Sequence, residues 1–224
     1  ANQRELVRGL GGAADVVLAN LNLRGDYRRA IAQLSEWSRT LEEMKRPAEL
    51  WAQVSLSGVE TWEPQLAAKR FARLFIAFQE RSVRFFWAHG PGDPSGLLDT
   101  MFDPMEVYYT AQTLGTLFDA SVTPDAEITA RVEGMEVPIR IAPFAGRDRL
   151  YVACWRDEEP GIDAERAEID LLIGGWHGKL LGVDTLSATS QELNGRREGA
   201  STRLAGLRVG DAPLVIVLWP EGAP

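Results

Sequence analysis

The residues whose types and spacing could carry chemistry are few in this chain. His89 and His177 are the two histidines, and neither has an obvious acidic neighbour in sequence. We expect both to be loop histidines without a functional role, the alternative being a catalytic or metal-binding role. The sequence has no phosphate-binding GxxxxGK loop, no HExxH pair and no paired-cysteine metal site. We therefore expect no metal and no cofactor.

Composition and charge argue against several other classes of function. The 224 residues are 45% hydrophobic and 25% charged, as in ordinary globular proteins, and the formal net charge is -8. This acidic balance, with scattered basic residues, argues against a nucleic-acid partner. No apolar stretch reaches the roughly 18 residues that a membrane span needs. The single cysteine, Cys154, lies in an apolar run, so we expect a core residue in preference to a reactive thiol.

The first half of the chain alternates short apolar runs with amphipathic helical patterns. Compact apolar runs predict buried strands, and apolar residues that recur every three or four positions predict helices. The predicted strands are 15–22, 49–56 and 83–87, and the predicted helices are 27–45, 63–80 and 108–118, with Asp26 and Thr61 as caps and a Gly/Pro-rich loop at 89–96. This order is typical of βαβ units in a parallel sheet, and three strands are too few to close a barrel.

The second half changes to many short β-like runs separated by turn residues. The predicted strands are 128–132, 137–141, 150–155, 169–173, 179–183, 201–204 and 214–219. Short strands at regular spacing are typical of an antiparallel β-sandwich. The predicted fold is therefore an α/β part, residues 1–120, followed by an all-β sandwich, residues 121–224.

Four stretches of the first half stand in a fixed order, with room for one helix between successive strands. They are DVVLANLN at 15–22, RPAELWAQVS at 46–55, RFFW at 84–87 and DPMEVYYTA at 103–111, with Leu114 beyond. In this order they resemble the end of the barrel in clan A glycoside hydrolases, which are retaining enzymes on a (β/α)8 scaffold. The resemblance covers roughly residues 10–118 and implies strands six to eight of such a barrel. The trailing sandwich also suits the clan.

The resemblance implies roles for particular residues. Gln53 stands where strand seven of the clan ends on the nucleophilic Glu. Asn20 and Asn22 stand where His and Tyr are common on strand six, at the sites where the clan does its work. Trp87 stands where a Trp at the end of strand eight lines the sugar site, and Trp62 would form part of a groove wall.

The tryptophans have a second interpretation. Aromatic rings stack on the apolar faces of sugars, as they do on other flat apolar surfaces, and they also fill protein cores. Trp87 fits a sugar platform and a core residue equally well, whereas we expect Trp51 to lie in the core.

Gln53 is the departure from the clan that bears on catalysis. A retaining glycosidase needs two carboxyl groups about 5–5.5 Å apart, and a neutral carboxamide is a very poor nucleophile. Glu49 stands four residues upstream, too early to reach the carboxyl end of the strand, where barrel enzymes place their chemistry. The acid/base carboxylate would lie on strand four of the barrel, and we find only the counterparts of strands six to eight in this sequence. Gln53 is an engineered substitution, a natural feature of a pseudoenzyme, or an ordinary strand residue that the alignment misplaces.

Two hypotheses of function follow from the resemblance. The first is a glycoside hydrolase-like protein, or part of one, that acts on or binds an oligosaccharide or polysaccharide in an extracellular or periplasmic setting. A second chain or an N-terminal half would then complete the barrel. The alternative is a non-catalytic carbohydrate-binding or assembly protein built on a degenerate glycosidase scaffold.

Overall fold

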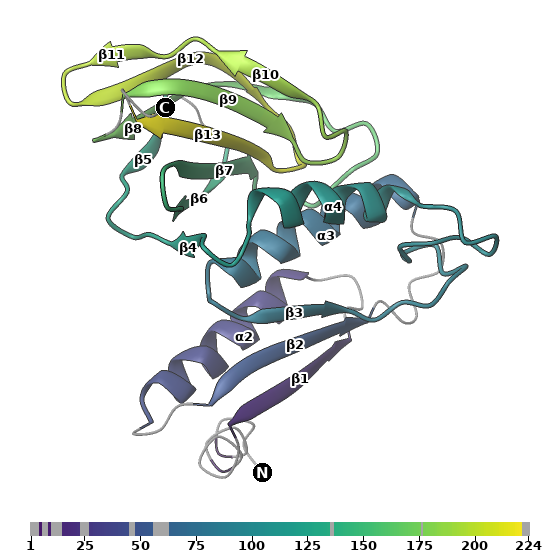
Figure 1. Ribbon diagram of the computed structural model, residues 1–224. Helices are drawn as coiled ribbons and strands as arrows, with labels where there is room; N and C mark the ends of the chain where they lie inside the picture. The colour runs from purple at the N-terminus through teal and green to yellow at the C-terminus, as the bar shows by residue number, and fades with distance from the viewer. Residues whose placement is uncertain are drawn as a thin grey trace.

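The computed structural model describes residues 15–22, 27–44, 48–55, 63–134, 137–175 and 177–220, together with residues 5 and 9 (Figure 1). Its N-terminal part is a three-stranded parallel sheet in the order β1-β2-β3, with helices between successive strands. The elements of this part are β1 (Val16–Asn22), α2 (Tyr27–Glu42), β2 (Glu49–Ser55), α3 (Pro64–Gln79), β3 (Arg84–Trp87) and α4 (Glu106–Leu117).

These elements confirm the strand and helix order predicted from the sequence. The helix predicted to reach Lys45 ends at Glu42, and α4 begins two residues before its predicted start. Glu63 is the N-cap of α3 and Pro64 opens the helix, a position that suits proline because its missing N–H would be unpaired there anyway. The caps predicted at Asp26 and Thr61 lie outside the described residues. No helix in the described part of the chain is long and apolar enough to span a membrane.

The two faces of the parallel sheet differ. One face is buried under the helices, because alternate residues such as Val17, Leu50 and Val54 join a core with apolar side chains of α2 and α3. The residues between them point to the opposite face, where Leu18 is 51% exposed and Phe86 is 44% exposed. Parallel sheets are normally covered on both faces, so this open apolar face is unusual.

The C-terminal part consists of two antiparallel sheets that lie above α3 and α4 in Figure 1. The six-stranded sheet has the order β10-β9-β13-β7-β6-β4, and the four-stranded sheet has the order β11-β12-β8-β5. Their strands are β4 (Thr123–Pro124), β5 (Ala130–Glu133), β6 (Ile139–Ala145), β7 (Leu150–Arg156), β8 (Ala167–Gly174), β9 (Gly178–Asp184), β10 (Ser190–Leu193), β11 (Arg196–Glu198), β12 (Ser201–Val209) and β13 (Leu214–Pro220).

All seven strands predicted for this half are present, and three further strands were not predicted. The missed strands β4, β10 and β11 are edge strands, and their side chains are almost all exposed. An exposed edge strand buries neither face, so it lacks the apolar alternation that identifies a strand in sequence.

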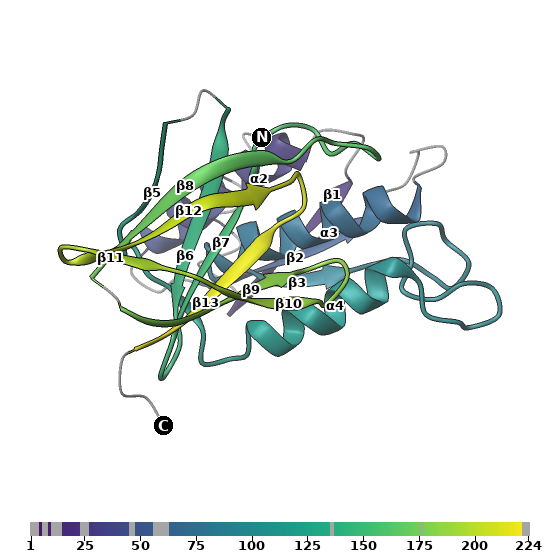
Figure 2. The ribbon, with the colours of Figure 1, turned by 90° about the horizontal axis from the view of Figure 1, so that it is seen from above.

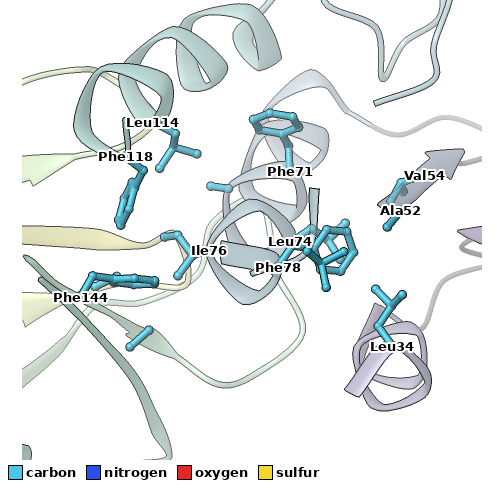
Figure 3. Close-up of a cluster of buried hydrophobic side chains, with 14 of the residues drawn as sticks. Leu34, Ala52, Val54, Phe71, Leu74, Ile76, Phe78, Leu114, Phe118 and Phe144 are labelled. Carbon is cyan, nitrogen blue, oxygen red and sulfur yellow. The ribbon is translucent and has the colours of Figure 1, made fainter. Parts of the chain in front are cut away.

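One hydrophobic core runs through the molecule from the parallel sheet to the antiparallel part. Ala52 and Val54 of β2 contact it from one side, α3 crosses its middle, and Phe118 and Phe144 lie on the other side (Figure 3). A second cluster fills the space between the two antiparallel sheets and includes Cys154. Burial raises the pKa of the Cys154 thiol to about 12, which confirms the prediction of an inert core residue.

Buried charges on α3 fasten the helix to loops of the C-terminal part. Lys69 Nζ lies 2.9 Å from Asp211 Oδ1, and both side chains are buried. Arg73 is fully buried and donates to the backbone carbonyls of Asp211, Arg156 and Glu158. Each of these charges has partners within the core, whose attraction and hydrogen bonds offset the desolvation cost of burying it.

Candidate functional site

A row of side chains crosses the open face of the parallel sheet near its carboxyl edge. In the strand register Asn20 pairs with Gln53, and Gln53 pairs with Phe86. Laterally paired residues of parallel strands point to the same face, so these three side chains stand side by side. Asn20 and Phe86 are exposed and Gln53 is half-buried. Two residues further along the strands, Asn22 is in register with Ser55. The side chain of Asn22 lies outside the described part of the structure.

The carboxamides of Asn20 and Gln53 are available to a ligand. Among the described residues, neither side chain forms a hydrogen bond within the protein. A carboxamide offers two donor hydrogens and an acceptor oxygen, and a sugar hydroxyl both donates and accepts. The two groups brought together by the register can therefore contact neighbouring hydroxyls of a bound sugar.

An aromatic and charged cluster lies beside this row on the same face. The rings of Trp51 and Phe86 are 5.4 Å apart, and the Arg84 guanidinium lies 5.2 Å from the centre of the Trp51 ring. The indole N–H of Trp51 donates to Glu49 at 2.9 Å, and Arg84 pairs with the same carboxylate at 3.4 Å. The expectation that Trp51 lies in the core was therefore wrong, because its strand position directs it to the open face.

Glu49 does not make a catalytic pair at Gln53. The two residues are four positions apart on one strand, which corresponds to roughly 13 Å, compared with the 5–5.5 Å between the carboxyls of a retaining glycosidase. Glu49 is also engaged by Arg84 and Trp51. Among the described residues of this face no other carboxylate is present, so the row offers hydrogen bonds and ring stacking.

Trp87 lies on the other face of the sheet. Its ring meets that of Phe71 edge-on at 5.1 Å and that of Phe85 at 5.8 Å, in the core under the helices. Its indole N–H donates to the carbonyl of Ser95 at 2.6 Å. Of the two roles considered for Trp87, these contacts favour packing, and they do not bring it to Gln53. Trp62 lies outside the described residues.

His89 has an acidic partner that was not recognised in the sequence. Its Nδ1 lies 2.8 Å from Asp93 Oδ2, and its side chain is only 3% exposed. Burial raises the pKa of Asp93, but the hydrogen bonds from His89 and from the Ser95 N–H outweigh that effect and hold the pKa below its usual value. His89 is therefore built into the loop after β3. His177, the other histidine, lies 3.1 Å from the hydroxyl of Thr202.

A cavity of the described chain lies elsewhere, between α3 and strands of the C-terminal part. It has a volume of about 1070 Å³ and is lined by residues of β9, β10 and β12 together with Lys69 and Asp211. Its lining is mostly polar, none of the predicted site residues contributes to it, and no aromatic side chain lines it among the described residues. The described residues also include no group of three or more acidic, histidine or cysteine side chains that could hold a metal. We place the candidate site at the Gln53 row because the stacking rings lie there.

Comparison with known proteins supports the fold. No family model matches the sequence, and no curated protein matches it. A family 30 endoxylanase from Clostridium papyrosolvens C71 superimposes with a TM-score of 0.55 at 9% identity, over 96% of this chain and 59% of that one. A glucosidase from Croceicoccus marinus gives 0.55 at 14% identity, over 96% and 56%. A family 51 α-L-arabinofuranosidase from Bifidobacterium longum gives 0.52 at 11% identity, over 97% and 55%.

These similarities concern the fold. Almost the whole chain superimposes on glycoside hydrolases of several families, so the expected likeness to them is confirmed in three dimensions. The chain spans between 55% and 59% of the length of these three structures. The chain therefore has a mixed α/β fold of the glycosidase kind, with few helices and many strands.

Proposed function

We propose that this chain forms part of a carbohydrate-binding protein on a glycosidase scaffold, with the sugar held at the Gln53 row. In this proposal β1, β2 and β3 correspond to strands six, seven and eight of a (β/α) barrel, and a β-sandwich begins near residue 121. The observation that carries the proposal is the in-register row of Asn20, Gln53 and Phe86 on the open face, near the edge at which barrel proteins bind their ligands.

The chemistry of the row suits binding of an uncharged sugar better than cleavage. Two free carboxamides match hydroxyl groups, and the rings of Trp51 and Phe86 offer surfaces for the apolar face of a pyranose. With Gln53 at the position of the nucleophile, no covalent glycosyl intermediate can form there. The row would hold an oligosaccharide or polysaccharide without hydrolysing it by the retaining mechanism.

The open face also supports the proposal that further strands complete the barrel. Val16, Leu18 and Phe86 expose large apolar side chains on one side of a parallel sheet, a surface that water solvates poorly. Additional βα units would pair with the outer edges of β1 and β3 and close a barrel around this face, whose carboxyl end would stay open to a sugar. A second chain or an N-terminal half of the same polypeptide would supply them.

The Gln53→Glu variant separates a binding protein from an enzyme with a substituted nucleophile. The variant is assayed with aryl glycosides whose activated leaving groups do not need an acid catalyst. Because the described part of the open face has no second carboxylate near Gln53 to activate the water that would release a glycosyl-enzyme intermediate, we expect no turnover above the wild-type level while sugar binding persists. A gain of hydrolysis would overturn the non-catalytic proposal and favour the alternative, a hydrolase whose nucleophile is replaced.

A matched control makes this test specific. Glu49→Gln removes the other carboxylate that we describe on this face. It stands roughly 13 Å along the strand from position 53, far from the expected position of the reacting carbon. If Gln53→Glu gains activity and the double variant with Glu49→Gln keeps it, the gained carboxylate acts at position 53 itself. Loss of activity in the double variant would show that the gain needs Glu49 as well as the new carboxylate at position 53.

A further inference from the structure

The loop between β3 and α4, residues 88–105, carries the most exposed large apolar side chains of the described chain. Met101 is 77% exposed and Phe102 is 68% exposed. The loop extends past the carboxyl ends of the three parallel strands and stands clear of the antiparallel sheets in both views (Figures 1 and 2). The loop therefore leaves the sheet at the carboxyl edge, to which Gln53 is close.

The loop is braced at its tip. Asp99 Oδ1 accepts hydrogen bonds from the backbone N–H groups of Met101 and Asp103, at 2.8 and 2.9 Å. The backbone N–H of Asp99 donates to the carbonyl of Asp103 at 3.0 Å, and that of Phe102 donates to the carbonyl of Asp99 at 3.2 Å. These bonds close the tip into a turn, so the backbone that carries the two apolar side chains is held in place.

The base of the loop is braced as well. Trp87 donates to the carbonyl of Ser95, and Asp93 accepts from both the N–H of Ser95 and the ring of His89. The Trp87 and His89 rings are 4.9 Å apart. The half-buried Trp87 and the buried side chain of His89 therefore anchor the base of the exposed loop.

Phe102 has a backbone conformation that large residues rarely adopt. Its φ is +66°, in the left-handed region, where glycine has no steric cost and a bulky residue is an outlier. The other non-glycine residues with positive φ in the described chain are the small Ser82 and Ala188. An aromatic ring kept at a position suited to glycine, and left in solvent, contributes little to folding. Strain of this kind is a feature of ligand-binding sites.

The charge around the loop limits the kind of ligand. From Phe85 to Ala130 the sequence contains no lysine or arginine. The loop and the start of α4 carry Asp93, Asp99, Asp103 and Glu106. Such a surface repels carboxylated or phosphorylated ligands and anionic membranes, and it accepts uncharged ones.

We propose that Met101 and Phe102 form a platform for a pyranose ring of a carbohydrate chain that carries no acidic groups. The platform lies outside the Gln53 row and would extend the binding surface along the chain of sugars. Phe102 supplies the flat ring and Met101 an adaptable apolar side chain beside it. This inference rests on the proposed function, because it assigns a second contact to the same carbohydrate.

The test compares Phe102→Gly with Ile162→Ala in calorimetric titrations of the native polypeptide with xylohexaose, cellohexaose and glucuronic acid-substituted xylan oligosaccharides. Ile162 is a control because it is 50% exposed and lies in the C-terminal part. We expect Phe102→Gly to lower the affinity for a neutral hexaose about tenfold while its Tm is unchanged or higher, since glycine relieves the backbone strain. Ile162→Ala should leave the affinity unchanged, and the acidic oligosaccharides should bind more weakly than the neutral ones.

Other outcomes overturn the inference in distinguishable ways. If the wild type binds a neutral hexaose and Phe102→Gly binds it equally well, the platform is wrong and the proposed function stands. A lower Tm in Phe102→Gly would show that the ring has a structural role. Loss of self-association without loss of sugar affinity would assign the loop tip to a contact between protein copies. If the wild type binds no tested sugar, the proposed function fails and the platform fails with it.

Discussion

The two faces of the parallel sheet use the same strands for opposite purposes. On the covered face, Ala52 and Val54 are completely buried and pack toward helices that connect the sheet to the rest of the molecule. On the open face, the same strands carry Gln53, Trp51 and Phe86. The Phe86 side chain is exposed, and those of Gln53 and Trp51 are half-buried. The covered face therefore maintains the fold, while the side chains of the open face have no covering layer among the described residues.

Helix α3 explains why the covered face is well secured. Its apolar side chains, such as Phe71 and Phe78, pack in the core under the sheet. Its buried Lys69 and Arg73 reach loops of the antiparallel part. The open face has no comparable layer among the described residues, which leaves its apolar side chains exposed.

The largest expected effect separates the two faces by stability. Leu74→Ala removes a fully buried side chain of α3 and should lower the free energy of unfolding by about 3 kcal/mol, because it leaves a cavity in the core. Leu18→Ala on the open face should cost less than about 0.5 kcal/mol. Urea denaturation of both variants measures the difference.

Either variant can contradict or sharpen the comparison. If Leu74→Ala costs less than about 1 kcal/mol, the covered face is not the close-packed core described here. If Leu18→Ala costs as much as Leu74→Ala in the native polypeptide, the open face is covered there. That result would support the proposal that further strands complete a barrel.

A smaller effect concerns the loop that Trp87 and His89 anchor from the covered face. The pKa of Asp93 is lowered from its usual 3.8, so Asp93 stabilises the folded state at pH values above 3.8. This contribution is lost as the pH falls through the lowered pKa, because the carboxylate is then protonated in both states. Asp93→Asn should lower the urea midpoint at pH 7, and its difference from the wild type should shrink below pH 3.8.

The control for this prediction is Asp163→Asn, at an exposed position of the C-terminal part. It should leave the urea midpoint unchanged at pH 7. A midpoint for Asp93→Asn that equals the wild type at pH 7 would show that the His89–Asp93 pair does not brace the loop.

The element order could be predicted from the sequence, whereas the orientation of the site residues could not. A period of two places Trp51 and Gln53 on one face of β2, but it does not say which face the helices cover. Buried parallel strands are apolar on both sides, so the apolar pattern does not distinguish them. The resemblance suggested a sugar-site role for Trp87, which fitted a core role equally well, and the strand register puts Trp87 on the covered face with Val54.

Other parts of the site depend on contacts that a pattern does not reveal. The partner of His89 is four residues away in a Gly/Pro-rich loop, and only the fold of that loop brings the two side chains together. The exposed ring of Phe102 gives no sequence signal, because its conformation is fixed by hydrogen bonds to Asp99. The order of the strand motifs could be predicted from the sequence, and in the structure it places Gln53 in register with Asn20.

The central claim is that the open face binds carbohydrate through Asn20 and Gln53. Its most direct test is a calorimetric titration of the native polypeptide, with any chain that copurifies with it, against xylohexaose and cellohexaose. The wild type should bind at least one of them, and the double variant Asn20→Ala/Gln53→Ala should bind it at least about tenfold more weakly, with the same urea midpoint. Equal affinity in the double variant, or no binding by the wild type, would contradict the claim.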